Sequence, residues 1–315
     1  MEESKKEKLV VLIGPTAVGK TKLSIELAKK LNAEIISGDS MQIYKGMDIG
    51  TAKITRDEME GIPHHLIDIK EPNESFSVVE FQEVVRKLIT EIHKRGKLPM
   101  IVGGTGLYIQ SVIYDYQFTN EASDSDYRKL LEQQVAERGI ETLFQELKEI
   151  DPNSAERIHP NNVRRVIRAL EIFKTTGKTM TEYMEGQKHE LLYDLVLIGL
   201  TMDRELLYDR INKRVDLMVE TGLLDEVSAF YSRGLRNCQS IQAIGYKELY
   251  SYLDGKLSLD EAINDLKQNT RRYAKRQLTW FRNKMDVKWF DMSMENEFDE
   301  KFNEIYKYIA GKLEI

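Results

Sequence analysis

The chain has a single cysteine, Cys238, among its 315 residues, so it cannot form an internal disulfide. Such a chain suits a reducing compartment, and the charged residues 1–8 lack the apolar core of a secretory leader, so we expect a cytoplasmic location. No apolar run approaches the roughly 20 residues needed to cross a bilayer, which excludes a membrane-spanning segment. Internal repeats and low-complexity tracts are also absent, which excludes a repeat array.

The composition is that of a folded globular protein, with 41% hydrophobic and 31% charged residues. A length of 315 residues allows one large or two ordinary domains. The net charge of −6 alone argues against a nucleic-acid partner, but the basic residues are unevenly distributed. Residues 264–284 hold seven basic side chains against one acidic one, and Arg164, Arg165 and Arg168 form a second basic group. These patches are either solvated helix faces or a surface for nucleic acid.

The first specific motif has the pattern G-x-x-x-x-G-K-T, which is typical of a phosphate-binding P-loop. Its residues are Gly14, Pro15, Thr16, Ala17, Val18, Gly19, Lys20 and Thr21. An apolar strand is predicted over residues 9–13 and an amphipathic helix over residues 22–31, which is the context that a P-loop needs rather than a chance glycine turn. Backbone N–H groups and the helix N-terminus favour an anion, Lys20 adds a charge, and Thr21 is a candidate Mg²⁺ ligand. The motif predicts a bound di- or triphosphate.

Further buried strands are predicted over residues 33–37, 98–102, 195–200 and 287–290, with helices at 76–95, 204–220 and 258–283. Between residues 118 and 192 the strand signals disappear and helices are predicted at 125–139, 141–149 and 162–175. We therefore predict an α/β fold with a P-loop NTPase-like parallel sheet flanked by helices and an all-helical insertion domain. The predicted core is residues 1–117 with 193–315, and the insertion is residues 118–192.

Two further positions are candidates for chemistry because they follow predicted strands. Asp39 comes after the second strand, at the end where α/β folds place ligands, although a turn or cap is the alternative. Thr105 lies in the turn Gly103-Gly104-Thr105-Gly106 and could place its hydroxyl beside the P-loop, or simply belong to a tight turn. The adjacent His64 and His65 favour a structural or substrate-contact role over metal binding, because neighbours on a strand point to opposite faces.

Seven motifs in order resemble those of the bacterial tRNA dimethylallyltransferases (isopentenylpyrophosphate:tRNA transferases). They are GPTAVGKT (14–21), DSMQIYKGMDIGTAK (39–53), PHHLID (63–68), GGTGLY (103–108), RIHPNNVRRVIRALE (157–171), QAIGYKE (242–248) and KRQLTWFR (275–282). The resemblance extends from about residue 9 to residue 290. The second and last motifs are highly specific, whereas the P-loop alone is not.

The resemblance implies transfer of a dimethylallyl group from dimethylallyl diphosphate to N6 of adenosine 37 in tRNAs that read UNN codons. The P-loop would then hold the diphosphate leaving group, with Mg²⁺ at Thr21 and with Arg214 from the 204–220 helix also reaching the diphosphate; an exposed helix arginine is the alternative. Asp39 matches the general base of the family, and Thr105 would hold the amine or Asp39 in line. Attack by the weakly nucleophilic exocyclic amine requires removal of its proton as the new bond forms.

The partners expected are tRNA, through its anticodon stem-loop, and dimethylallyl diphosphate, with the protein itself a monomer. Trp280 and Phe281 either stack on bases or pack in the core. The implied tRNA contacts are Asp39, Ser40, Met41, Gln42, Thr105, Arg128, Arg164, Arg165, Val166, Ile167, Arg168, Gln242, Ala243, Ile244, Gly245, Tyr246, Lys247, Lys275, Arg276, Gln277, Leu278, Thr279, Trp280, Phe281 and Arg282.

Three other functions fit parts of the sequence. A small-molecule or nucleotide kinase would explain the P-loop through ATP binding, but it leaves both basic patches and the insertion without a role. A GTPase switch requires D-x-x-G and N-K-x-D motifs, and neither is found. A non-catalytic RNA-binding protein would explain the basic patches but not the P-loop.

Overall fold

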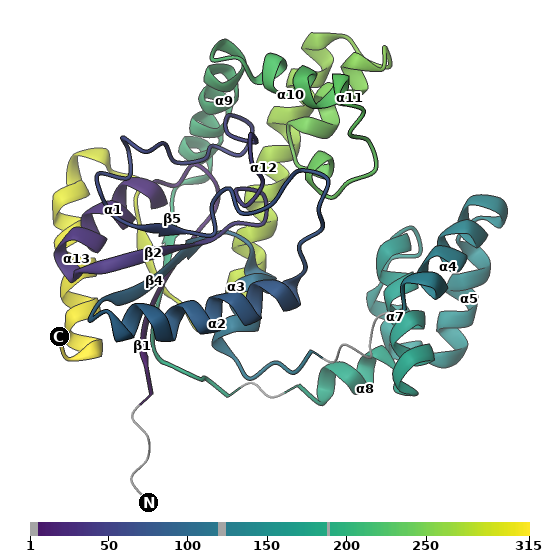
Figure 1. Cartoon of the computed structure of the whole chain (residues 1–315), viewed down its shortest axis with the longest axis horizontal. Coiled ribbons are helices and arrows are strands. Elements are labelled where there is room, and N and C mark those ends of the chain that lie inside the picture. Colours follow the sequence, from purple (N-terminus) through teal and green to yellow (C-terminus); the bar gives the residue numbers. More distant parts are fainter. Residues whose placement is uncertain (1–5, 119–123, 188–189) are drawn as a thin grey trace, which may run out of the picture. The chain divides into compact units, whose positions relative to one another are not determined.

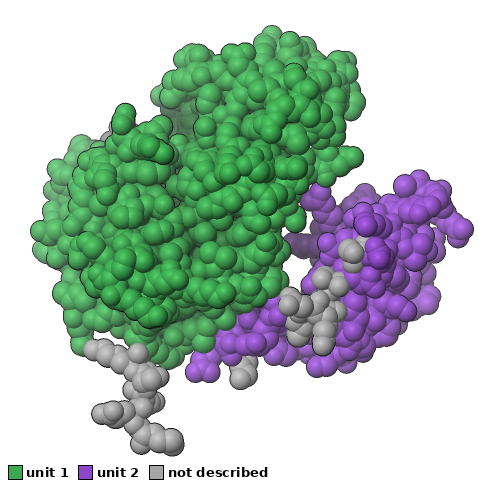
Figure 2. Space-filling view, in the orientation of Figure 1, with its two compact units in different colours: residues 1–113, 191–315 green, residues 114–190 purple. Residues whose placement is uncertain are grey.

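The computed structural model describes residues 6–118, 124–187 and 190–315. The first five residues of the charged N-terminal stretch therefore lie outside the described residues. The chain divides into two compact units, with residues 1–113 and 191–315 in unit 1 and residues 114–190 in unit 2 (Figure 2). The predicted insertion, residues 118–192, differs from unit 2 by no more than four residues at either end.

Unit 1 is built around a six-stranded sheet in which every strand pair is parallel, in the order β3-β2-β4-β1-β5-β6. The strands are β1 (Lys8–Ile13), β2 (Ala33–Gly38), β3 (His64–His65), β4 (Leu98–Gly103), β5 (Asp194–Thr201) and β6 (Lys288–Asp291). Ile13 on β1 is in register with Gly103 on β4, which is in register with Gly38 on β2. The segments that follow these three neighbouring strands therefore leave the sheet side by side.

Helices cover both faces of this sheet (Figure 1). Helices α1 (Lys20–Leu31) and α13 (Phe298–Leu313) share one hydrophobic cluster with alternate residues of β1, such as Val10 and Leu12. Helices α2 (Val78–Lys94) and α3 (Gly106–Ile113) pack together on the other face. A C-terminal group contains α9 (Arg204–Glu220), α10 (Leu223–Ser232), α11 (Tyr246–Leu253) and the long α12 (Leu259–Lys284).

The regular elements of unit 2 are all helices among the residues described: α4 (Ser125–Arg138), α5 (Glu141–Ile150), α6 (Pro152–Arg157), α7 (Val163–Thr176) and α8 (Met180–Glu185). Its own hydrophobic core includes Leu131, Leu143 and Leu170. The short helices α6 and α8 were not predicted, because six residues are too few to show a helical period. The buried Asp151 holds both, accepting hydrogen bonds from the backbone N–H groups of Ser154 and Thr181.

The predicted fold class is confirmed by this sheet and its flanking helices. Long elements agree with the sequence to within about two residues; for example, the predicted helix 258–283 is α12, Leu259–Lys284. Across the described part of the chain, no helix is both long enough and apolar enough to cross a membrane.

Candidate active site

The glycine-rich loop between β1 and α1 has the strand–loop–helix arrangement that a phosphate-binding loop requires. Gly19 precedes α1 with a φ of 102°, a left-handed conformation that favours glycine. The ammonium group of Lys20 turns back onto its own loop, where it donates hydrogen bonds to the carbonyl oxygens of Gly14 at 2.9 Å and Pro15 at 2.8 Å. Burial, reinforced by the charge of Arg214 and opposed by Asp39, lowers the pKa of Lys20 to about 7.

Arg214, predicted to reach the diphosphate, extends from α9 to this loop, with Nη1 3.4 Å from Oγ1 of Thr16. Burial is the main cause that lowers the pKa of Arg214, with Arg210 adding to it and Glu58 opposing it. Lys20 and Arg214 are thus two partly desolvated cations that lie near each other at the start of α1. An anion bound between them would reduce their mutual repulsion and compensate for the water that burial removes from them.

Thr21 is exposed at the first turn of α1, and it lines a small cavity of about 40 Å³ together with Ser37 and Gln42. No group of three histidine, cysteine or acidic side chains that could hold a metal alone occurs among the described residues. Mg²⁺ usually binds through only one or two protein oxygens, with phosphate oxygens and water completing its shell. The Thr21 hydroxyl therefore fits a metal that arrives with a diphosphate.

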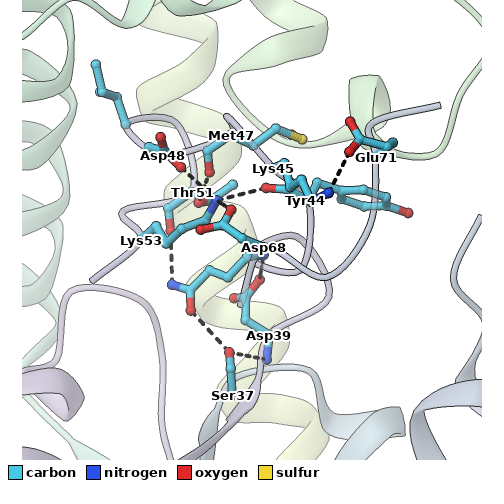
Figure 3. A network of polar contacts seen from close by, with 12 residues as sticks. Ser37, Asp39, Tyr44, Lys45, Met47, Asp48, Thr51, Lys53, Asp68 and Glu71 are labelled. Carbon is cyan, nitrogen blue, oxygen red and sulfur yellow. Dashed lines mark hydrogen bonds and ion pairs between the residues drawn. The ribbon is translucent and has the colours of Figure 1, made fainter. Parts of the chain in front are cut away.

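Asp39 follows β2 and caps its own turn, because its Oδ1 accepts from the N–H groups of Met41 at 2.8 Å and Gln42 at 3.3 Å. The Asp39 N–H donates to Oγ of Ser37, as Figure 3 shows. These bonds fix the carboxylate while using only Oδ1. Because Ile13 and Gly38 are both in register with Gly103, Asp39 and the phosphate loop leave the sheet at the same edge, and Asp39 is one of the charges that act on the Lys20 ammonium.

The Thr105 turn meets the Asp39 loop directly. Oγ1 of Thr105 accepts from the N–H of Ser40 at 3.2 Å, and the two hydroxyls are 3.5 Å apart. Burial, followed by the negative charge of Asp39, raises the pKa of Tyr273 on α12. The structure therefore brings together three of the predicted groups, the P-loop, Asp39 and Thr105. Tyr273 was missed from the sequence.

Two side chains of α12 pack against the glycines of the Thr105 turn. Nε2 of Gln277 would lie 2.0 Å from a Cβ on Gly104, and the Trp280 ring would lie 2.2 Å from one on Gly106. Only glycine permits these approaches. Gly104 and Gly106 are thus explained by the close packing of α12, whereas a Cβ on Gly103 would meet the backbone of Gly38 at 2.4 Å.

The loop after Asp39 is held by polar contacts with other parts of unit 1 (Figure 3). The Lys53 side chain is 4% exposed, and its Nζ donates to the carbonyl oxygen of Tyr44 and to the carboxylates of Asp48 and Asp68. The amide of Gln42 is also engaged, with Nε2 donating to the carbonyl oxygens of Thr51 and Ala52 at 3.3 Å. Gln42 therefore organises the loop in addition to its predicted role as an RNA contact.

Glu226 on α10 anchors the same loop from the outside. Its carboxylate accepts from the backbone N–H groups of Asp48 at 2.9 Å, Ile49 at 2.7 Å and Gly50 at 3.0 Å. The Tyr246 hydroxyl donates to the same carboxylate, and burial followed by the Glu226 charge raises the pKa of Tyr246. Glu226 was missed because the backbone N–H groups that it binds lie more than 170 residues away in the chain.

Comparisons with known proteins identify the family. A model of the IPP transferase family matches residues 42–284. The chain belongs to the IPP transferase family. It is 70% identical to a tRNA dimethylallyltransferase of Bacillus cytotoxicus, over all of this chain and 98% of that one. It is 68% identical to the enzyme of that name from Bacillus licheniformis, over 98% of this chain and 99% of the relative.

Two solved structures are similar throughout. The tRNA isopentenylpyrophosphate transferase of Bacillus halodurans has a TM-score of 0.75 and 61% identity, covering 98% of this chain and 97% of that one. A eukaryotic dimethylallyltransferase described as acting on tRNA has a TM-score of 0.84 and 34% identity, covering 98% of this chain and 79% of that one. The predicted family and fold class are therefore confirmed.

The residues predicted as tRNA contacts of this IPP transferase differ in their exposure. Lys275, Arg276, Thr279 and Arg282 are exposed along one side of α12, and Gln242 and Lys247 are exposed near the start of α11. The side chains of Ala243, Tyr246, Gln277 and Phe281 are buried, as is Gly245, and Ile244, Leu278 and Trp280 are half-buried. Phe281 is fully buried and Tyr246 contacts Glu226, so these two side chains pack inside the protein and are not available to a ligand at its surface.

Unit 2 carries the second basic group. Arg164 and Arg165 are exposed on α7, whereas Val166 and Ile167 lie in the core of the unit and cannot meet RNA with their side chains. The exposed Arg128 and the half-buried Arg168 both pair with the buried Glu171, at 2.6 and 2.8 Å. The one carboxylate of Glu171 therefore pairs with both arginines and balances one of their two positive charges.

The two adjacent histidines have structural partners. Nδ1 of His64 is 2.8 Å from the carbonyl oxygen of Ile62, and burial lowers the pKa of His64. Nε2 of His65 is 2.7 Å from the carboxylate of Glu34, which also pairs with Arg95 at 2.6 Å. Arg95 is the first cause that lowers the pKa of Glu34, so this carboxylate is ionised beneath the sheet edge.

Proposed function

We propose that the protein transfers the dimethylallyl group from dimethylallyl diphosphate to N6 of adenosine 37 in tRNAs that read UNN codons. One observation carries the proposal: a fixed carboxylate, Asp39, lies beside a phosphate loop whose two cations, Lys20 and Arg214, are partly desolvated. The leaving diphosphate requires the cations of the loop, and the acceptor amine requires a carboxylate that can take its proton. The two environments must lie next to each other for the transfer to occur. The names of the relatives support both the prenyl donor and the tRNA acceptor.

Catalysis at this site would rest on stabilising the charge that develops on the leaving group. As the bond between C1 of the allyl group and the diphosphate oxygen breaks, the electron pair passes to the diphosphate. The N–H groups of the loop, Lys20 and Arg214 would bind that growing charge, a type of stabilisation that commonly contributes several kcal/mol. A Mg²⁺ ion bound with the diphosphate at Thr21 would supply further positive charge to its oxygens.

The acceptor side would supply the nucleophile and remove its proton. N6 of the adenine forms the new bond to C1 as the old bond breaks, and the N6 proton passes to the carboxylate of Asp39. Thr105, held by its hydrogen bond from the Ser40 N–H, would keep the amine in line. Positioned bases of this kind typically contribute ~10²–10⁴-fold to the rate.

Adenosine 37 must leave the stack of the anticodon loop to reach this site. Unstacking costs a few kcal/mol, which binding of the RNA backbone must offset. The exposed cations of α12, Lys275, Arg276 and Arg282, are suited to that contact in unit 1, and Arg164 and Arg165 are suited to it in unit 2.

The experiment incubates the protein with dimethylallyl diphosphate, Mg²⁺ and an unmodified UNN-reading tRNA transcript, with no ATP. A matched transcript carries guanosine at position 37. We expect N6-(dimethylallyl)adenosine in digests of the first transcript and none in the second. Equal prenylation of both transcripts would reject position 37 as the target, and no prenylation of either would reject the proposed function.

A further inference from the structure

Helix α12 has two faces with different chemistry. Arg272, Lys275, Arg276, Thr279 and Arg282 are exposed, whereas Gln277 and Phe281 are buried. The spacing of Tyr273, Gln277 and Phe281, four residues apart, puts these three on one side of the helix. One helix therefore presents cations to the surface and polar groups to the active site.

Gln277 is the polar group on this inner face that reaches two separate loops. Its Oε1 accepts from the N–H of Thr16 at 3.0 Å, and its Nε2 donates to the carbonyl oxygen of Gly104 at 3.0 Å. The residue is 6% exposed, and both ends of its amide are satisfied. The same side chain thus joins the phosphate loop to the turn that carries Thr105.

Both ends of this bridge are attached to groups that the proposed reaction uses. Thr16 is the residue that Arg214 contacts, so its position affects the cation as well as the loop backbone. Gly104 directly precedes Thr105, which bonds to Ser40 beside Asp39. A shift of α12 along or about its axis would therefore move the diphosphate side and the acceptor side together.

We propose that Gln277 is a positioning residue that couples RNA binding on the exposed face of α12 to the affinity of the phosphate loop for diphosphate. The inference rests on the proposed function, because it takes tRNA and a diphosphate as the two ligands. RNA that binds the cations of α12 fixes the helix, and Gln277 passes that constraint to the Thr16 and Gly104 backbones. Diphosphate then binds a loop that is already in place. Coupling between sites in proteins is typically about 5–150-fold in affinity.

The test measures binding of inorganic diphosphate with Mg²⁺ by calorimetry, with and without a synthetic anticodon stem-loop RNA. We expect the RNA to tighten diphosphate binding to the wild-type protein by about fivefold or more. Gln277→Met keeps the length of the side chain but removes both hydrogen bonds, and it should abolish this tightening while diphosphate alone still binds. Gln268→Met is the matched control, since Gln268 is exposed on the same helix and its variant should behave as wild type.

A purely structural role would lower the melting temperature of Gln277→Met and leave the tightening by RNA intact, which would overturn the inference. If Gln277→Met does not fold, the isosteric Gln277→Glu replaces it, because it keeps the acceptor for Thr16 and loses the donor to Gly104. Coupling retained in either folded variant, or a wild-type protein that binds both ligands independently, would also contradict the proposal. A wild-type protein that binds neither ligand would instead reject the proposed function.

Discussion

The ammonium group of Lys20 is bonded to the carbonyl oxygen of Gly14, 2.9 Å away, inside the loop that it would use to hold a phosphate. A lysine in this position is removed from water and lies near a second cation, Arg214, so its pKa falls to about 7. A bound diphosphate would draw the ammonium group away from its own loop and favour its charged form. Ligand binding should therefore be linked to the protonation of this one side chain.

The first prediction is that diphosphate binding takes up a proton above pH 7. In the free protein Lys20 loses its proton as the pH rises through about 7, whereas in the complex the anion keeps it protonated to higher pH. Affinity should fall by up to about tenfold per pH unit above that value. Calorimetry at about pH 8 in two buffers of different ionisation enthalpy measures the uptake. Lys20→Met is the control, and equal uptake in that variant would assign the proton to another group.

The second prediction separates the two roles of Asp39. Asp39→Asn retains an oxygen for the N–H groups of Met41 and Gln42, so the turn should stay folded, but the variant can no longer accept the N6 proton. We expect turnover to fall ~10²–10⁴-fold while diphosphate affinity is retained. Asp286→Asn, at an exposed position, serves as the matched control. Wild-type turnover of Asp39→Asn with saturating substrates would exclude the general-base role.

The sequence predicted the long elements of the fold because their apolar periods are regular. It also placed Asp39 and Thr105 directly after predicted strands, at the end where α/β folds bind ligands. It could not predict that Gln277 faces the active site. A glutamine in a basic helix carries no periodic signal, and its partner Gly104 is 173 residues distant. The role of Glu226 was not predicted either, because it depends on a contact between α10 and a loop that is distant in the sequence. Motif resemblance identified α12 as important but did not distinguish its outer from its inner residues.

The third prediction concerns the anchor of the loop after Asp39. Tyr246→Phe removes the hydroxyl that donates to the Glu226 carboxylate and leaves the three backbone donors in place. Because hydrogen bonds to charged groups contribute about 1.5–3 kcal/mol, the free energy of unfolding should fall by about that amount. Denaturant unfolding measures it. Tyr252→Phe, on the same helix and only half-buried, should change little, and a loss as large as that of Tyr246→Phe would show that Glu226 is not the cause.

The fourth prediction concerns the exposed cations of α12. Affinity for tRNA should decrease steeply with salt concentration, because several phosphates are neutralised. Lys275→Gln should weaken binding and reduce the slope of log affinity against log salt by about one, as expected for loss of one phosphate contact. Lys312→Gln removes an exposed charge from α13 and should leave the slope unchanged. A flat salt response of the wild-type protein would remove the basic face of α12 from the RNA-binding surface.

The most direct measurement of the central claim counts both products of one reaction. The protein is given unmodified tRNA, dimethylallyl diphosphate, Mg²⁺ and radiolabelled ATP, and released diphosphate and prenylated adenosine are quantified over time. The account predicts one diphosphate released per adenosine prenylated, at a rate that does not depend on ATP and with no label transferred. Transfer of label from ATP without prenylation of the tRNA would contradict it and identify the phosphate loop as that of a kinase.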